Sequence, residues 1–416
     1  MLTAPDLTAL TVSTVRVGDP GPLLALLPEQ GPLAWVSDGE GLVGWGCAAR
    51  VELIGRSRFA DAQAWWQALV ARAEVSDALR LPGTGLVAFG SFAFDADVTS
   101  SALVVPEVVV GHRDGAWWVT TVSAPGEPVS GRLPKRDPAR PPVGMRFIED
   151  AAADAAHCAS VADAVARIEA GELAKVVLAR EVHAHADEPV DVRWPLEQLT
   201  RDYPVCWTFS VDGLIGATPE VLVRLRDGLA TSRVLAGTLR RSGDSNEDLR
   251  RGQDLPRSIK DVEEHGYAVR SVADSLGRHS SSIEVPAAPF VLELPNVMHL
   301  ASDVSAVVLP GTTSLALAAA LHPSAAVCGT PTGAAWGVIS EVERLDRARY
   351  AGPVGWTGAD GDGEWGIALR CAEVDAADPA HLRLFAGGGI VAGSKPRDEL
   401  AETVSKMVPM RTALLG

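Results

Sequence analysis

Residues 173–181, LAKVVLARE, are the stretch from which the fold can be read most directly. Val176, Val177 and Leu178 form a continuous apolar run rich in β-branched side chains, which predicts a buried strand. Lys175 comes directly before this run, although a lysine is seldom fully buried without a partner. Taken alone, Lys175 fits a strand end from which the side chain reaches water.

The segments around this strand predict an alternation of strands and helices. Residues 154–172, DAAHCASVADAVARIEAGE, form an amphipathic pattern that predicts a helix running into the strand. Residues 125–143, PGEPVSGRLPKRDPARPPV, are rich in proline, glycine and charge and predict an exposed linker or long loop. Short strands and one helix precede this linker. After it, strands and helices alternate without a fixed repeat or the glycine pattern of a dinucleotide or phosphate loop.

Composition excludes several classes of protein. The chain has 416 residues and a net charge of −16, so a nucleic-acid surface, which requires a basic patch, is not expected. No signal peptide is visible, and no apolar run approaches the ~20 residues of a membrane helix. The five cysteines are scattered and never form a C-x-x-C pair, which argues against disulfides and zinc. We therefore expect a cytoplasmic protein that does not bind a membrane.

Carboxylates in three further segments are candidates for chemistry. Glu220 follows a proline at the start of the apolar strand in GATPEVLVR, residues 216–224. In residues 258–277, SIKDVEEHGYAVRSVADSLG, the helical period places Glu264 opposite the apolar stripe, which by itself predicts a solvated carboxylate. In residues 384–407, a strand is expected to end in three glycines before a helix on which Glu399, Glu402 and Lys406 share one face. That face is either a salt-bridged surface stripe or a carboxylate pair for a hard cation such as magnesium.

Together these segments resemble the chorismate-utilising enzymes, and within them the isochorismate synthases. The matching stretches occur in the family's order: KVVLAR, GATPEVLVR, LAGT, KDVEEH, MHLASDV, LHPSAAVCGTP, YAGPVGW, GEWGIALRCAEV, RLFAGGGIV and ELAETVSK. The resemblance implies a large α+β fold in which antiparallel sheets stack as a sandwich with helices outside. It marks residues 151–416 as the chorismate-binding catalytic region and residues 1–150 as a variable N-terminal part of the same unit.

The resemblance also implies roles for individual residues. Lys175 matches the general base that activates water, and Glu220 matches the general acid that protonates the departing ring hydroxyl. An acid must hold its proton, so the pKa of Glu220 is expected to be raised. Glu264, Glu399 and Glu402 match the positions that hold Mg²⁺, which contradicts the solvated position that periodicity alone predicts for Glu264.

Ten further positions match the substrate-binding residues of the family. Arg370 is expected to pair with a carboxylate of chorismate from a strand face whose neighbours, Gly366, Ala368 and Ala372, are all small. The ten positions are Gly237, Thr238, His299, Ala326, Val327, Tyr350, Arg370, Gly387, Gly388 and Lys406.

Three positions favour one branch of the family. Enzymes that use ammonia usually carry glutamine at the position of Lys175, and aminodeoxychorismate synthases usually carry lysine at the position of Ala236. Salicylate synthases, which go on to eliminate pyruvate, typically carry lysine at the position of Thr332. These positions favour an isochorismate synthase, an isomerase. The resemblance to the family further implies a monomer that serves menaquinone or siderophore biosynthesis. Salicylate synthase, another chorismate enzyme and a catalytically silent chorismate-binding relative remain the alternatives.

Overall fold

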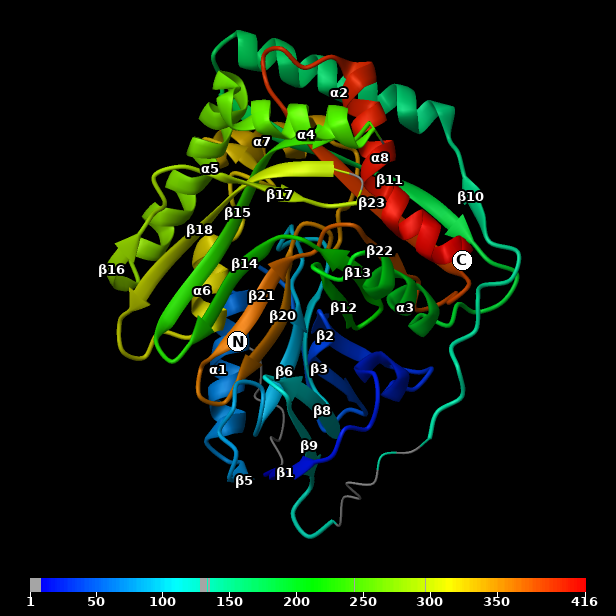
Figure 1. Ribbon diagram of the computed structural model, residues 1–416, viewed down its shortest axis with the longest axis vertical. Coiled ribbons are helices and arrows are strands. Elements are labelled where there is room, and N and C mark those ends of the chain that lie inside the picture. The colour runs from blue at the N-terminus through cyan, green and yellow to red at the C-terminus, as the bar shows by residue number, and fades with distance from the viewer. Residues whose placement is uncertain (1–8, 128–132, 134, 243, 296) are drawn as a thin grey trace.

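The computed structural model describes residues 9–127, 133, 135–242, 244–295 and 297–416. Eight side chains within these ranges lie outside the description: Ala236, Thr238, Arg240, Ser245, Ile259, Lys260, Asp261 and Glu264. The described chain folds into two large sheets with helices outside them, as Figure 1 shows. The α+β sandwich expected from the sequence is confirmed.

The first sheet contains strands from both ends of the chain. In spatial order its strands are β10 (Arg146–Ile148), β11 (Lys175–His185), β23 (His381–Ile390), β22 (Cys371–Val374), β13 (Leu214–Thr218), β12 (Trp207–Val211), β2 (Leu33–Ser37), β3 (Glu40–Trp45), β8 (Val108–Arg113), β9 (Ala116–Ser123), β1 (Thr11–Val17) and β5 (Glu74–Asp77), with β19 (Gly329–Thr330) paired to β11. Strands β1 and β5 run parallel, and the other pairings between the described strands of this sheet are antiparallel.

The second sheet is antiparallel throughout its described strands. Its order is β16 (Ser280–Glu284), β18 (Val297–Val308), β15 (Leu229–Arg240), β14 (Val221–Arg226), β21 (Gly363–Ile367), β20 (Pro353–Gly358), β6 (Val87–Ser91), β7 (Ser101–Val105) and β4 (Ala49–Leu53), with β17 (Phe290–Glu293) paired to β18. Both sheets therefore combine strands that precede residue 150 with strands that follow it.

Helices cover the outer faces of the sheets. They are α1 (Arg58–Val70), α2 (Ala151–Glu169), α3 (Arg193–Asp202), α4 (Ser245–Asp254), α5 (Ile259–Gly277), α6 (Ser314–Leu321), α7 (Thr332–Val342) and α8 (Pro396–Leu415), with short 3₁₀ turns at η1 (Leu23–Leu26) and η2 (Leu255–Arg257). Helices α5 and α6 lie along one side of the molecule, and α2, α7 and α8 gather at one end (Figure 1). Within the described residues, no helix is long and apolar enough to cross a membrane.

The expected helices form for local reasons that the sequence displays. The side chain of Asp150 caps α2 by accepting hydrogen bonds from the backbone N–H groups of Ala152 and Ala153 at 2.8 and 3.2 Å. Helix α8 begins at Pro396, whose missing N–H costs nothing in the first turn of a helix. Strand β11 is buried from Lys175 to Arg180, on both faces, which explains its continuous apolar run.

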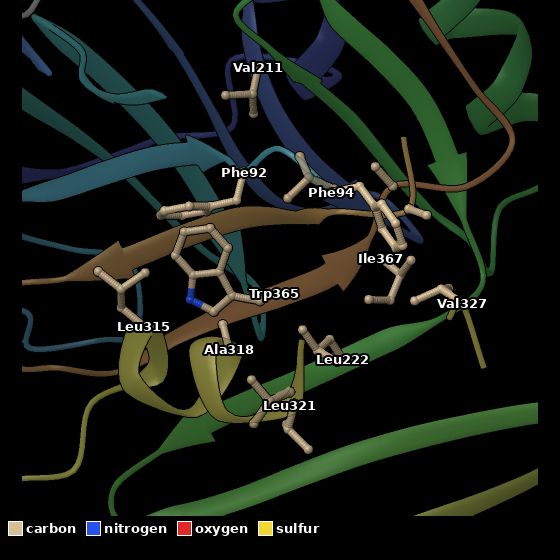
Figure 2. Packing of buried hydrophobic residues seen from close by; sticks show 14 of the residues in the cluster. Phe92, Phe94, Val211, Leu222, Leu315, Ala318, Leu321, Val327, Trp365 and Ile367 are labelled. Atoms are coloured by element: carbon tan, nitrogen blue, oxygen red, sulfur yellow. The ribbon is translucent and has the colours of Figure 1, made fainter. Parts of the chain in front are cut away.

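The core lies between the sheets and under the helices. It joins Trp35 and Phe209 of the first sheet to Phe89, Trp356 and Trp365 of the second. Trp35 also donates a hydrogen bond from Nε1 to Glu364 Oε2 at 3.0 Å, which ties the two sheets together. Figure 2 shows α6 below Trp365 in this core, with Ala318 of the helix beneath the indole ring and Leu315 and Leu321 to either side of it. Fully burying one leucine side chain, relative to leaving it exposed, stabilises the fold by about 1.5–3 kcal/mol.

Candidate active site

A cavity of about 170 Å³ lies where β11 and β23 of the first sheet approach β15 and β18 of the second. It brings together most of the residues that the sequence singled out: Lys175, Glu220, Gly237, His299, Ala326, Val327, Tyr350, Arg370, Gly387, Gly388, Glu399, Glu402 and Lys406. These residues come from segments more than two hundred positions apart in the chain. The remaining two, Thr238 and Glu264, have backbones in β15 and α5, and their side chains lie outside the described residues.

Lys175 is the first residue of β11 and lies in the wall of this cavity. Its backbone pairs with Thr330 of β19, so the strand does not end in solvent at this point. Only 8% of the residue is exposed. The interpretation of Lys175 as a strand-end lysine reaching bulk water is therefore wrong, because β19 covers the edge of β11 and the second sheet covers its face.

Glu220 reaches the same cavity from the short link between β13 of the first sheet and β14 of the second. It directly precedes β14, and its N–H donates to Thr218 Oγ1 at 3.2 Å while its carbonyl accepts from Ile367 N–H at 3.1 Å. Burial raises the pKa of the Glu220 carboxyl to about 7, and the opposing attraction of Arg370, Lys175 and Lys406 does not offset it. A raised pKa is the property expected of a general acid near neutral pH.

Helix α8 supplies two carboxylates and an ammonium to the cavity. Lys406 Nζ lies 2.6 Å from Glu402 Oε1 and donates to the carbonyl of Gly387 at 2.9 Å, which fixes α8 against β23. Burial alone would raise the pKa of Glu402, but the charge and hydrogen bond of Lys406, aided by Arg370 and Lys175, lower it. Glu402 is therefore an ionised carboxylate, and the α8 face is a cavity wall, not a surface stripe.

Glycines in β23 leave the room that these carboxylates occupy. A Cβ at position 388 would lie 3.2 Å from Glu399 Oε2 and 3.7 Å from Glu402 Oε1. The three glycines lie at the end of β23, which continues one residue beyond them to Ile390, close to the end that the sequence predicts. Backbone pairing with β11 holds this stretch extended without any side-chain contribution.

Arg370 reaches the cavity from a bend, not from a strand. It lies between β21, which ends at Ile367, and β22, which begins at Cys371. Its φ of 48° is in the left-handed region, which breaks the alternation of a continuous strand. The predicted strand face shared with Gly366, Ala368 and Ala372 is therefore wrong, although the predicted place of Arg370 beside the cavity is what the structure shows.

The two neutral ring side chains of the site have strongly shifted acid–base properties. Burial, assisted by repulsion from Arg370 and Lys406, lowers the pKa of His299 to about 3. Burial raises the pKa of the Tyr350 hydroxyl above its ordinary value. His299 is thus a neutral imidazole and Tyr350 a neutral phenol at pH 7, and both can hydrogen-bond to a polar ligand without adding charge.

Sequence reasoning missed the buried ion pair behind the site. Arg347 Nε lies 2.6 Å from Glu343 Oε1, and the two side chains are 2% and 3% exposed. Arg347 donates to the carbonyls of Val177 and Val327, which line the cavity, at 2.7 and 3.0 Å. Glu343 Oε2 accepts from Ala179 N–H at 2.7 Å. In EVERLDR, residues 341–347, the spacing of four between Glu343 and Arg347 is compatible with an ion pair. Nothing in that sequence indicated that the pair bonds to the β11 backbone where a neighbouring strand would otherwise do so.

Comparison with known proteins gives consistent matches. The family described as "Chorismate binding enzyme" matches residues 30–128 and 131–415. Isochorismate synthase DhbC of Bacillus subtilis is 41% identical over 61% of this chain and 66% of its own length. A Pseudomonas aeruginosa protein named "Salicylate biosynthesis isochorismate synthase" is 34% identical over 92% of this chain and 84% of its own length.

A solved structure has the same fold. The menaquinone-specific isochorismate synthase MenF of Escherichia coli superimposes with a TM-score of 0.81, at 23% identity, over 99% of this chain and 96% of its own. The match extends over both sheets, so the arrangement of the N-terminal strands is shared as well as that of the C-terminal region.

Proposed function

The chain belongs to the chorismate-binding enzyme family, and we propose that it is an isochorismate synthase, an isomerase that converts chorismate to isochorismate. The observation that supports this most strongly is the meeting of Lys175 of β11 and Glu220 of the β13–β14 link in a single cavity. The activity named for relatives that are 41% and 34% identical points the same way.

In the proposed reaction Lys175 is the general base and Glu220 the general acid. Lys175 takes a proton from a water molecule whose oxygen bonds to the ring carbon next to the carboxylate-bearing carbon. The ring double bonds shift, and the bond between the ring and its hydroxyl breaks. Glu220 gives its proton to that hydroxyl, which leaves as water, so one water enters and one departs. A carboxyl with a pKa of about 7 is half protonated at neutral pH and can therefore perform this step.

Two cations would hold the carboxylates of chorismate. The guanidinium of Arg370 offers a planar fork for a bidentate pair, and Lys406 contributes a point charge beside the β23 backbone. These charges explain how a chain of net charge −16 can bind a dianion. The neutral His299 and Tyr350 would add polar contacts without weakening that attraction.

We further propose that Glu264, Glu399 and Glu402 hold Mg²⁺. The ionised Glu402, and the open space that Gly388 leaves beside it and Glu399, suit a hard cation with oxygen ligands. When bound, the ion supplies Lewis-acid polarisation and a grip on the ring carboxylate. The isochorismate would serve menaquinone or siderophore biosynthesis in the cytoplasm, where the five free thiols of the chain stay reduced.

Product analysis tests the proposal. Purified protein is incubated with chorismate and Mg²⁺, with and without a chelator, and followed by proton NMR. We expect isochorismate in equilibrium with chorismate, and none when the chelator is present. Salicylate with pyruvate would assign the chain to the neighbouring branch. Binding of chorismate without turnover would instead indicate the catalytically silent relative.

A further inference from the structure

A second cavity, of about 860 Å³, shares no lining residue with the catalytic one. Its walls come from α1, from the segment that follows β6, from α6 with the loop after it, and from α7. The proposed reaction uses none of these residues. Two polar side chains and three aromatic ones define the chemistry of this cavity.

The first polar side chain is Arg58, at the start of α1. It is only 7% exposed, and its Nη2 donates to the carbonyls of Ala93 and Phe94 at 3.2 and 3.5 Å. Its Nε has no hydrogen-bond partner, and among the described residues no carboxylate forms an ion pair with it. Burial lowers its pKa despite the more distant charges of Asp95 and Asp97. The guanidinium carbon of Arg58 also lies 4.8 Å from the centroid of the Phe59 ring. Carbonyl and ring contacts do not neutralise a buried charge, which is still best completed by a carboxylate counter-charge.

The second is His322, which is 9% exposed. Neither ring nitrogen makes a hydrogen bond of normal geometry within the described structure, although a weak backbone hydrogen bond links the ring to Phe94. Burial, with repulsion from Arg58, lowers the pKa of His322 to about 3, so the ring is neutral at pH 7. It therefore offers an acceptor nitrogen that protein groups do not satisfy, and a donor that Phe94 satisfies only weakly.

Aromatic rings form the remaining walls. Phe94 stacks on Trp336 with ring centroids 5.0 Å apart, and Phe59 lies 6.2 Å from the His322 ring. Negative charge comes from the half-buried Asp95 and from Asp97 at the mouth, whose side chain is 62% exposed and lies 3.8 Å from Arg56, which is 90% exposed. The inner wall thus combines Arg58 with aromatic rings, and Asp95 lies between it and the charge-balanced rim.

We propose that this cavity is a second small-molecule site, and that it binds a small aromatic carboxylate. The carboxylate would pair with Arg58, the ring would pack among Phe59, Phe94 and Trp336, and a polar substituent would bond to His322. Such a ligand supplies both the missing counter-charge and the missing hydrogen-bond partners.

The site is connected to the catalytic cavity through Phe94. The guanidinium carbon of Arg347 lies 4.2 Å from the centroid of that ring, and Arg347 holds the carbonyls of Val177 and Val327. Because both valines line the catalytic cavity, a ligand that displaces Phe94 also shifts the wall beside Lys175. We therefore expect that an aromatic carboxylate bound in the second cavity changes the apparent affinity of the catalytic cavity for chorismate.

The test uses 4-fluorophenylacetate as the probe and fluorine NMR as the readout, on the full chain with Mg²⁺. We expect a saturable bound signal that persists in excess chorismate. Arg58→Gln should weaken probe binding about tenfold or more, since hydrogen bonds to a charged group contribute on that scale. Arg56→Gln, which removes an exposed charge from the rim, is the matched control and should bind the probe as wild type does.

Trp336→Leu provides a second variant if Arg58→Gln fails to fold, and circular dichroism checks both. Lack of binding, full displacement by chorismate, or unchanged binding in the variants would overturn the proposal. In wild type, saturating probe should also change the KM for chorismate at least twofold, and this change should be absent in Arg58→Gln. A KM that does not respond would overturn the connection through Phe94.

Discussion

Glu220 is the residue whose environment most sharply determines its chemistry. It lies buried at the start of β14, and its folded-state pKa is about 7. The proposed acid is the protonated form, which predominates below that pH. We therefore expect kcat/KM to fall as the pH rises through about 7, at saturating Mg²⁺, because this ratio reports the ionisation of the free enzyme. A profile that stays flat between pH 6 and 9 would remove Glu220 from this role.

The raised pKa of Glu220 also predicts that the free energy of unfolding depends on pH. Between its ordinary pKa of 4.5 and about 7, Glu220 is protonated when the chain is folded and ionised when it is unfolded. The folded state then binds more protons, so its stability falls as the pH rises through this window. Glu220→Gln should therefore raise the free energy of unfolding at pH 8 by about 3 kcal/mol relative to wild type. Denaturant unfolding at pH 4 should show no such gain, and an equal gain at both pH values would contradict the account.

Lys175 carries the complementary prediction. Lys175→Ala should lower kcat by about 10²–10⁴-fold, the usual contribution of a positioned general base. Chorismate binding in the presence of Mg²⁺, measured by calorimetry, should stay close to wild type because Arg370 and Lys406 remain. Lys135→Ala, at an exposed position, is the control. Turnover near the wild-type rate would show that another group activates the water.

At the scale of elements, the contact between β23 and α8 determines the proposed metal position. Gly388→Ala places a Cβ about 3.2 Å from Glu399 Oε2, so the α8 carboxylates must move. We expect the Mg²⁺ concentration that gives half-maximal activity to rise severalfold. The control is Gly393→Ala, where a Cβ meets nothing within 4 Å. If both variants titrated with Mg²⁺ as wild type does, the α8 carboxylates would not hold the ion.

The Glu343–Arg347 pair supports β11 along an edge that lacks a neighbouring strand. Its groups satisfy the Val177 carbonyl and the Ala179 N–H in place of a strand. Arg347→Leu leaves Glu343 as an uncompensated buried charge, which costs about 3–5 kcal/mol. Thermal or denaturant unfolding should show this loss, whereas Arg344→Leu at an exposed position should not. Equal effects of the two substitutions would contradict a supporting role for the pair.

At the scale of the whole molecule, sequence patterns predicted the elements better than their contacts. The apolar run at Val176 and the amphipathic pattern before it predicted β11 and α2, because period and propensity are local properties. They could not show that β19 covers Lys175, since that pairing joins residues far apart in the chain. For the same reason periodicity alone left open whether the face of Glu399 and Glu402 is a surface stripe or a cation site, and the site emerged only from the resemblance to a family.

The bend at Arg370 shows another limit of sequence patterns. Small residues alternate with larger ones in GIALRCAEV, which predicts an unbroken strand, yet the chain turns at a left-handed arginine. Arginine has no special preference for that conformation, so no local signal marks the position. The surrounding sheet holds it there, and the turn delivers the guanidinium to the cavity.

The central claim, that Lys175 and Glu220 exchange one water for one ring hydroxyl, is tested most directly by isotope labelling. The protein is incubated with chorismate and Mg²⁺ in water enriched in oxygen-18, and the isochorismate is examined by mass spectrometry at low conversion. The account predicts one oxygen-18 atom in the new ring hydroxyl of each product molecule. Isochorismate without the label would mean that the original hydroxyl migrates within the substrate, and it would contradict the roles assigned to both residues.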